Sequence, residues 1–243
     1  MGTQTTAGGV RARARAEMRQ AILDAARDHL AVDGAASLSL RAVARDVGMV
    51  SSAVYRYFES RDALLTALII DAYNALGEAA EAAEAAVDRS DVAGRWRATA
   101  TAVRSWALAN PHQYALVYGS PVPGYVAPQD TVGPATRVTA LLAGILRDVA
   151  REQPGASGSG AQSGTDDALV AIAPMREYLG PEVPADLAQR GLLAWTSVFG
   201  WVSFELFGQL HRVVEPDGRA TAFVAQVDRL GAEMLGVPVV PSD

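Results

Sequence analysis

Apolar residues recur along this chain at intervals of three and four positions, the spacing that gathers them on one face of a helix. The first predicted helix covers residues 13–32, and Gly34 is its expected C-terminal stop. A short amphipathic segment over residues 39–47 comes next, and Gly48 separates it from a second short segment over residues 51–58. Two short helices joined through a glycine are typical of a helix-turn-helix.

The remainder of the chain predicts longer helices. Ser60 is expected to cap a helix over residues 61–87, which ends in an Ala/Glu stretch of high helix propensity. The Pro/Gly-rich residues 119–134 predict a loop, and the low-complexity residues 153–166 predict a disordered segment. The other helices are predicted at residues 91–109, 111–118, 135–151, 167–179, 185–212 and 217–235.

These elements predict an all-α protein of about nine or ten helices in two domains. The N-terminal domain, residues 1–62, consists of a flexible basic arm over residues 1–12 and a three-helix head. Residues 63–243 form a C-terminal helical bundle. The expected core of the head comprises Ala21, Ile22, Ala25, Ala26, Leu30, Leu40, Val43, Ala44, Val47, Val54 and Phe58.

The net charge of −6 is divided unevenly along the chain. Residues 1–62 carry a net charge of +2, and the remaining residues carry −8. All 21 basic residues are arginine, whose guanidinium forms bidentate contacts with phosphate and guanine. A basic N-terminal domain joined to an acidic C-terminal domain is expected when only the N-terminal domain contacts nucleic acid.

Composition and motifs exclude several kinds of site. The chain has no cysteine, and its three histidines lack the spacing of metal ligands, so we expect no metal and no cofactor. No nucleophile elbow, phosphate loop or metalloprotease motif is present, so we expect no catalytic residues. The N-terminus lacks the apolar run of a signal peptide, which favours a cytoplasmic location.

One apolar window, Leu192 to Leu210, has about the length of a membrane span. It contains Glu205 and Gln209 and has no basic flank. A buried core or interface helix is therefore the favoured interpretation, and we expect no association with a membrane.

The two short helices carry a restrictive motif, Gly48-x-x-x-x-Ala53-Val54-Tyr55-x-Tyr57-Phe58, followed by Ser60-Arg61-Asp62-Ala63-Leu64-Leu65. This motif resembles the TetR family of bacterial transcriptional regulators, and the resemblance covers about residues 15–65. One position departs from the family pattern, because Val50 stands where the family has a small hydroxyl residue that caps the second helix. Ser51 is expected to provide the cap one residue later.

The resemblance implies how this head meets DNA. Tyr55 and Tyr57 match positions that donate to phosphates, and Arg61 matches a phosphate-binding Lys/Arg, whereas Arg41 matches a position that can reach a guanine edge. A bidentate contact from arginine to guanine is worth about 1–3 kcal/mol. The expected DNA-binding residues are Arg41, Ser51, Ser52, Ala53, Tyr55, Arg56, Tyr57 and Arg61.

Other roles remain open for some of these side chains. Tyr55 and Tyr57 could instead belong to a packed aromatic cluster, and Arg41 could lie on a solvated face as surface arginines usually do. Arg56 could contact either a base or the DNA backbone. Only the motif around these residues favours the functional interpretation.

The C-terminal segment from Leu193 to Leu206 resembles a domain class named for a Trp-His-Gly signature. Trp195 and Gly200 match the signature, and Phe199 stands at the histidine position. In the family, the last two long helices commonly pair with those of a second subunit. The resemblance therefore implies a homodimer that presents two recognition helices to a pseudo-palindromic operator.

Aromatic side chains in the body could line an inducer pocket between helices, although each one alone is also compatible with core packing. The expected ligand-binding residues are Trp106, Tyr114, Tyr118, Arg176, Trp195 and Phe199.

The sequence therefore predicts a homodimeric repressor that binds double-stranded operator DNA and is released by a small-molecule effector. A DNA-binding regulator without ligand control, or one that activates transcription, is the alternative. A helical enzyme with an accessory DNA-binding head lacks any catalytic motif, and a dimeric scaffold would leave the head unexplained.

Overall fold

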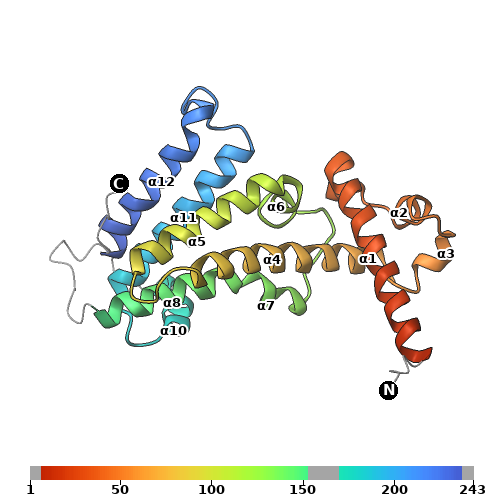
Figure 1. Ribbon diagram of the computed structural model, residues 1–243, viewed down its shortest axis with the longest axis horizontal. Helices are drawn as coiled ribbons and strands as arrows, with labels where there is room; N and C mark the ends of the chain where they lie inside the picture. The colour runs from red at the N-terminus through yellow and green to blue at the C-terminus, as the bar shows by residue number, and fades with distance from the viewer. Residues whose placement is uncertain (1–6, 153–169, 237–243) are drawn as a thin grey trace, which may run out of the picture. The chain divides into compact units, whose positions relative to one another are not determined.

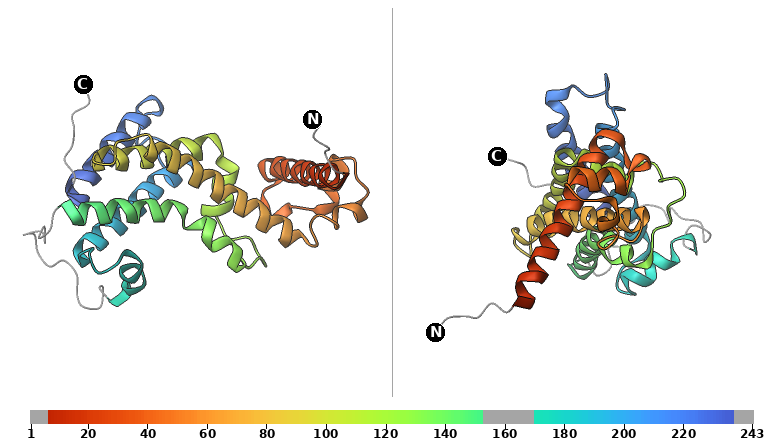
Figure 2. Two further views of the ribbon diagram at one scale, coloured as in Figure 1. Left: turned by 60° about the horizontal axis from the view of Figure 1, so that its bottom comes forward. Right: turned by 90° about the vertical axis from the view of Figure 1, so that its right-hand side faces the viewer.

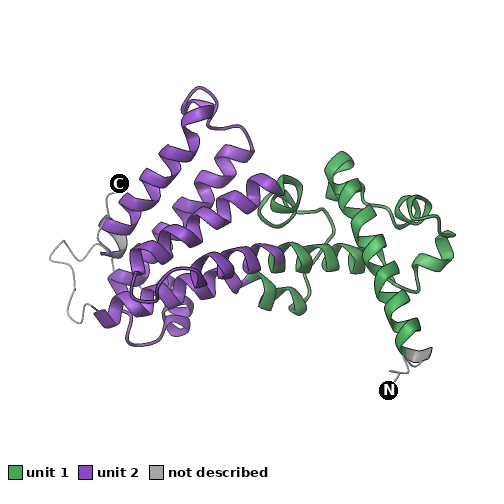
Figure 3. Ribbon diagram, viewed as in Figure 1, with its two compact units in different colours: residues 1–74, 110–135 green, residues 75–109, 136–243 purple. Residues whose placement is uncertain are grey.

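The computed structural model describes residues 7–152 and 170–236 (Figure 1). This part of the chain contains helices and turns and no strand, which confirms the predicted all-α class. The helices form two compact units, coloured separately in Figure 3. Unit 1 comprises residues 1–74 and 110–135, and unit 2 comprises residues 75–109 and 136–243.

Unit 1 is built around the predicted head. Its elements are α1 (Ala7–Asp33), η1 (Ala35–Ser37), α2 (Leu40–Asp46), α3 (Ser51–Val54), the first part of α4 (Arg61–Ala85), α6 (Pro111–Tyr118), η2 (Gln129–Thr131) and α7 (Val132–Ala135). The predicted core is largely confirmed, since Ile22, Val43 and Val54 are fully buried. Ala21 was a wrong core assignment: it is exposed, and Leu23 occupies the core beside Ile22.

The predicted boundary between arm and first helix is wrong, because α1 begins at Ala7 and not near residue 13. Alanine and arginine, which fill this stretch, are strong helix formers, and they outweigh the two glycines at its start. Residues 1–6 lie outside the described part of the chain. At the other end, Gly34 has φ +73° and its N–H donates to the Leu30 carbonyl, which confirms it as the stop of the helix.

Unit 2 contains the remainder of α4 and a set of longer helices. These are α5 (Val92–Ala109), α8 (Arg137–Glu152), α10 (Ala173–Leu179), α11 (Ala185–Leu206), η3 (Pro216–Gly218), α12 (Arg219–Leu230) and a π-helical turn, η4 (Gly231–Leu235). Helices α5, α11 and α12 pack side by side, as Figures 1 and 2 show. Their facing side chains, among them Trp96, Val198 and Phe223, are buried.

Several predicted bounds in the second half of the chain need correction. The expected loop over residues 119–134 includes the helical turns η2 and α7. The helix predicted over residues 185–212 ends at Leu206, and Gly208 then adopts a φ of +85°. The segment predicted to be disordered, residues 153–166, lies outside the described residues.

Helix α4 runs without a break from unit 1 into unit 2. The Ser60 hydroxyl accepts a hydrogen bond of 3.0 Å from the Ala63 N–H, which confirms the predicted N-cap. Among the described residues α4 is the one helix long and apolar enough to cross a membrane, and half of its apolar window is buried. Such burial is typical of the core helix of a globular protein.

Candidate functional site

The turn between α2 and α3 is a complete Schellman motif. Gly48 has φ +68°, a region that residues with a Cβ rarely adopt. Its N–H donates to the Arg45 carbonyl at 3.1 Å, and the Met49 N–H donates to the Ala44 carbonyl at 2.7 Å. Met49 also packs against the core of unit 1. The turn therefore ends α2 sharply and fixes the direction in which α3 begins.

The first turn of α3 has no side-chain cap. Val50 occupies the N-cap position with φ −67° and ψ 141°, and Ser51 is already the first helical residue. The prediction that Ser51 provides the cap was therefore wrong, because the backbone turn sets the start of α3 and leaves no oxygen at the cap. Val50 itself is 71% exposed.

The short α3 is extended by further turns as far as Phe58. The N–H groups of Tyr57 and Phe58 both donate to the Val54 carbonyl, at 2.9 and 3.1 Å. Val54 and Phe58 are buried in the core, as the motif predicts. They anchor one face of the recognition helix, so its other face is presented to solvent.

The predicted DNA-binding residues come from α2, α3, the turns that follow α3 and the start of α4. Arg41 on α2 is exposed, and Tyr55 is 47% exposed. Tyr57 is half-buried and packs partly against the core, so its ring has a structural role beside any contact of its hydroxyl. Of the remaining residues, those that are exposed are Ser51, Ser52 and Arg56, and those that are half-buried are Ala53 and Arg61.

Arg61 is held by protein groups. Its guanidinium donates to the carbonyls of Leu38 at 3.1 Å and Ala35 at 2.8 Å. These bonds tie the start of α4 to η1 and to the segment that leads into α2. The structure thus gives Arg61 a bracing role, and its contact with phosphate stays a prediction.

Two arginines that the sequence analysis did not assign to the site brace the recognition helix from α1. Arg15 donates to the Arg56 carbonyl at 3.2 Å, and its guanidinium lies 5.8 Å from the centre of the Tyr57 ring. Arg19 lies 5.0 Å from the centre of the Phe58 ring. Their i, i+4 spacing on one helical face was the signal available in the sequence.

The predicted ligand-binding residues are distributed over both units of the described structure. Tyr114 and Tyr118 lie on α6 in unit 1, where their ring centres are 4.9 Å apart. Tyr118 also meets Tyr73 edge to face at 6.0 Å, and burial raises the pKa of the Tyr118 hydroxyl. Tyr118 therefore packs against α4 within unit 1, and Tyr114 packs against Tyr118.

The other four predicted ligand-binding residues belong to unit 2. Trp106 and Phe199 are buried, and Arg176 is exposed on α10. Trp195 is half-buried, with its ring centre 5.9 Å from that of Phe199. Among these four, only Trp195 lines the cavity described next.

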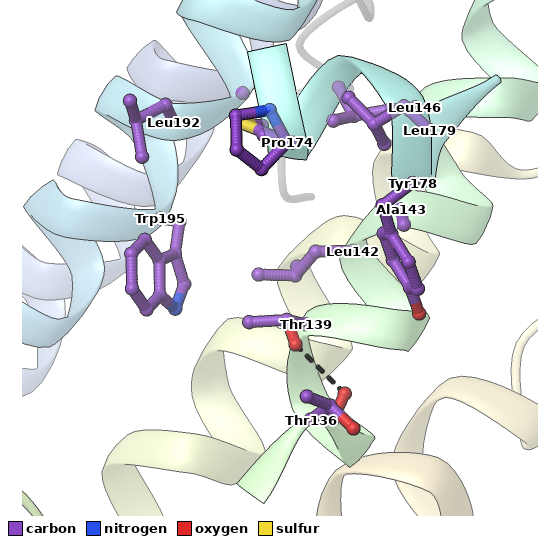
Figure 4. A pocket seen from close by; sticks show the side chains of 12 residues that line it. Thr136, Thr139, Leu142, Ala143, Leu146, Pro174, Tyr178, Leu179, Leu192 and Trp195 are labelled. Atoms are coloured by element: carbon purple, nitrogen blue, oxygen red, sulfur yellow. Dashed lines mark hydrogen bonds between the residues drawn. The ribbon is translucent and has the colours of Figure 1, made fainter. Parts of the chain in front are cut away.

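Unit 2 contains an apolar cavity of about 390 Å³ bounded by α8, α10 and α11. This volume lies within the range of small-molecule pockets. Figure 4 shows Trp195 extending from α11 on one side and Thr139 and Leu142 on α8. The lining residues are Thr136, Thr139, Leu142, Ala143, Leu146, Pro174, Met175, Tyr178, Leu179, Gly191, Leu192 and Trp195.

Helix α8, which lines this cavity, is tied to α4 at both of its ends. Near the N-terminus of α8, Arg137 donates to both carboxylate oxygens of Glu81 on α4, at 2.8 and 2.5 Å. Near its C-terminus, Asp148 accepts from Arg95 at 2.8 Å, and Arg95 also donates to Glu84 on α4 at 2.6 Å. A shift of α8 would therefore strain or move the end of α4.

The Arg95 cluster is buried, since only 1% of Arg95 is exposed. Burial alone would raise the pKa of Asp148, but hydrogen bonds from Arg95 and Arg89 outweigh it and lower that pKa. Burial likewise opposes the charge of Arg95, and its bonds to Asp148 and Glu84 raise its pKa overall. Asp148 and Arg95 are thus held in their charged forms.

The sequence of this chain is similar to two protein families and to two known regulators. Residues 22–68 match the family described as bacterial regulatory proteins, tetR family, and residues 96–230 match the tetracyclin repressor-like C-terminal domain. The chain is 43% identical over 224 residues to the HTH-type transcriptional regulator Rv1816 of Mycobacterium tuberculosis, which covers 85% of this chain and 88% of that protein. The regulator Mb1846 of Mycobacterium bovis matches equally well.

Solved structures agree with these matches. A crystal structure of a candidate regulatory protein, SCO4313, has a TM-score of 0.72 and 34% identity, covering 90% of this chain and 97% of that one. A protein of unknown function from Rhodococcus sp. RHA1 shares the fold, with a TM-score of 0.65, 24% identity and coverage of 90% and 95%. The matched ranges include both the Gly48 turn and the helices that bound the cavity.

Proposed function

Because this chain belongs to the TetR family of bacterial DNA-binding transcriptional regulators, we propose that it is a homodimeric repressor released from a pseudo-palindromic operator by a small-molecule effector. Its relatives are transcriptional regulators and not enzymes. The observation that carries the proposal is the exposed polar face of α2 and α3, which the Gly48 turn and the buried Val54 and Phe58 hold in place.

In the proposed complex, α3 enters the major groove. Arg41 reads a guanine edge from α2, while Ser51, Ser52 and Ala53 make short contacts to bases. The hydroxyl of Tyr57 donates to a phosphate, which sets the register of the head on the DNA.

The remaining predicted contacts of the head with DNA are to the backbone. They come from Tyr55, Arg56 and Arg61, and we add Arg15, which already holds the Arg56 carbonyl. Contacts of this kind supply affinity that falls as the salt concentration rises.

The outer face of α11 supports the homodimer. Leu193, Phe204 and Phe207 are 51%, 54% and 44% exposed and recur at helical spacing along this face. Gly200 lies on the same face, and a Cβ placed there would meet no atom within 4 Å. Exposed apolar side chains around a glycine suit the close approach of a second helix. We propose that α11 of a second copy packs here.

Ligand control is supported by the position of α8. This helix lines the cavity and is joined to α4 directly by the Arg137–Glu81 ion pair and indirectly by Arg95 of α5, which pairs with both Asp148 on α8 and Glu84 on α4. Helix α4 continues into unit 1. An effector that favours a different position of α8 would thereby change the position of α4 and of the heads. The coupling can be no larger than the difference between the effector's affinities for the two states.

Three further assignments accompany this proposal. Residues 1–62 bind DNA and residues 63–243 bind the effector and dimerise, although α6 and α7 pack within unit 1. The C-terminal domain belongs to the Trp-His-Gly class on the strength of Trp195 and Gly200. The protein acts in the cytoplasm, where operator DNA is found.

The decisive experiment compares operator binding with oligomeric state. We expect the wild-type chain to bind a palindrome upstream of its own gene as a dimer, with an affinity that falls steeply with salt. Gly200→Leu adds a side chain on the open face of α11, so circular dichroism should stay unchanged while sedimentation shows a monomer that loses the operator. Gly200→Ala is the control and should remain dimeric. A dimeric Gly200→Leu variant with full operator affinity would contradict the proposed interface.

A further inference from the structure

The cavity between α8, α10 and α11 indicates the chemical class of the effector. Building on the ligand control proposed above, we infer that it takes an uncharged, mainly apolar molecule that carries one hydrogen-bond acceptor. Three features of the cavity support this inference: its described lining residues carry no charge, the nearby Arg147 is used in other contacts while Arg176 does not line the cavity, and one polar group of the lining has no partner among the described residues.

Among the described residues that line the cavity there is no Asp, Glu, Arg or His. Its side chains are mainly aliphatic and aromatic, with Thr136 and Thr139 contributing hydroxyls at one edge. A carboxylate or ammonium group that entered this cavity would lose its water without gaining an ion pair, which strongly disfavours charged ligands. An uncharged ligand avoids this cost and gains from the apolar walls.

The neighbouring arginines do not supply the missing charge. Arg147 on α8 donates to the carbonyls of Tyr178 at 2.6 Å and Leu179 at 2.8 Å. Its guanidinium also lies 5.6 Å from the centre of the Tyr178 ring, on which it packs. Arg147 therefore fixes α10 to α8 and shapes the cavity wall. Arg176, which the sequence predicts to be a ligand-binding residue, is exposed on α10 and is not among the lining residues of this cavity.

One polar group of the lining lacks a partner among the described residues. The Trp195 indole N–H is shielded from solvent and has no hydrogen-bond acceptor. By contrast, the Trp96 N–H donates to the Val227 carbonyl at 2.7 Å, and the Trp201 N–H donates to Glu205 at 3.3 Å. A buried donor without an acceptor is unfavourable. A small turn of the Trp195 ring toward a ligand carbonyl or hydroxyl oxygen would provide the missing bond.

The Thr139 hydroxyl can complete the recognition of an alcohol. It donates to the Thr136 carbonyl at 2.8 Å, so its proton is used and its lone pairs remain available. A ligand hydroxyl could accept from Trp195 and donate to Thr139, whereas a ketone would use Trp195 alone. A hydrogen-bond acceptor on the ligand is therefore the main requirement, because it satisfies the Trp195 N–H. A donor on the ligand, which Thr139 could accept, adds to the affinity but is not required.

The test uses the 243-residue chain and four probes with a straight alkyl chain of nine or ten carbons: 1-decanol, decane, decanoate and decyltrimethylammonium, each kept below its solubility limit or micelle concentration. Binding is measured by calorimetry and by tryptophan fluorescence. We expect decanol to bind at least tenfold more tightly than decanoate or decyltrimethylammonium, and about tenfold more tightly than decane. Equal or tighter binding of either charged probe would overturn the inference.

Variants locate the binding. Trp195→Phe keeps an aromatic ring but removes the N–H, so it should erase the preference for decanol over decane. Trp201→Phe makes the same chemical change on α11 outside the cavity and should leave the preference intact. Leu142→Trp fills the cavity from a half-buried position and should abolish binding of both probes. Unchanged binding in Leu142→Trp, with a native circular dichroism spectrum, would exclude this cavity.

Operator binding is measured on the same samples, which separates the two proposals. If the operator is bound but no uncharged probe binds, because the second copy or another part of the chain covers the cavity, this inference fails and DNA binding stands. If the operator is not bound in any condition, the proposed function fails, whatever the probes do.

Discussion

The recognition helix of unit 1 is four residues long, whereas the cavity of unit 2 lies between α8, of 16 residues, and α11, of 22 residues. A four-residue helix has no stability of its own. Its position depends on the Schellman turn at Gly48, on the buried Val54 and Phe58, and on Arg15 and Arg19 from α1. The long helices need no such local support, because they are stable through their packing and their ion pairs.

This difference predicts how each region responds to substitution. In unit 1 the exposed side chains that we expect to meet DNA can change with little effect on folding, but the turn beneath them cannot. In unit 2 the side chains around the cavity can change the ligand without loss of fold, but the buried ion pairs that join the helices cannot. Four variants, each with its own control or measurement, test these statements.

Arg95→Met should have the largest effect. It leaves Glu84 and Asp148 without their buried partner, which typically costs about 3–5 kcal/mol. All four tryptophans, residues 96, 106, 195 and 201, lie in unit 2, so denaturation followed by tryptophan fluorescence reports on this unit. Arg89→Met is the control, because Arg89 also pairs with Asp148 but is 71% exposed, and it should cost less than about 1 kcal/mol. If the two variants lost the same free energy of unfolding, the burial of Arg95 would not explain its contribution to stability.

Arg41→Ala combined with Tyr57→Phe should come next. The pair removes a proposed guanine contact and a proposed phosphate contact, and the operator affinity should fall roughly a hundredfold. Tyr57→Phe keeps the ring that packs against the core, so the melting temperature should hardly change. Fluorescence anisotropy with labelled operator measures the loss. Full operator affinity in the double variant would show that these two side chains do not contribute to DNA binding.

Gly48→Ala should destabilise unit 1 by about 1–2 kcal/mol, because alanine disfavours the left-handed conformation of the turn. The effect is conformational and not steric, since a Cβ at Gly48 meets no atom within 4 Å. Gly144→Ala is the matched control in unit 2: it lies within α8, its Cβ would also be in open space, and it should stabilise by about 0.5–1 kcal/mol. Hydrogen exchange in each unit measures the change in its stability. If both variants stabilised or both destabilised their units, the left-handed conformation of Gly48 would not be the cause of the effect.

Val50→Thr should have the smallest effect and should be favourable. The residue already has the extended conformation of an N-cap, and a hydroxyl there could accept from an N–H in the first turn of α3, for a gain of about 1 kcal/mol. Val50→Ala is the control that changes size without adding an oxygen. Thermal denaturation checks the gain, and a Thr variant no more stable than the Ala variant would show that the cap does not form.

Local features of the sequence predicted local features of the structure well. Gly34, Gly48 and Ser60 end or begin helices as expected, because each acts through its own backbone or through a hydrogen bond to a residue three or four positions away. Two local predictions were wrong. The first helix was predicted to begin near residue 13, but helix propensity extends α1 back to Ala7. Ser51 was predicted to cap α3, but the backbone turn places it inside the helix. The roles of Arg15 and Arg19 depend on a second helix and were not foreseen.

By itself, the sequence determined the all-α class and the helix-turn-helix, and it indicated the surface that we propose to face DNA, because all of these follow from residues close along the chain. Only the tertiary structure decided which aromatic side chains meet. It placed Tyr114 and Trp195 in different units and brought Trp195 and Thr139 to the lining of one cavity. A cavity is the space that remains between helices distant in sequence, and the spacing of residues within one helix carries no record of it.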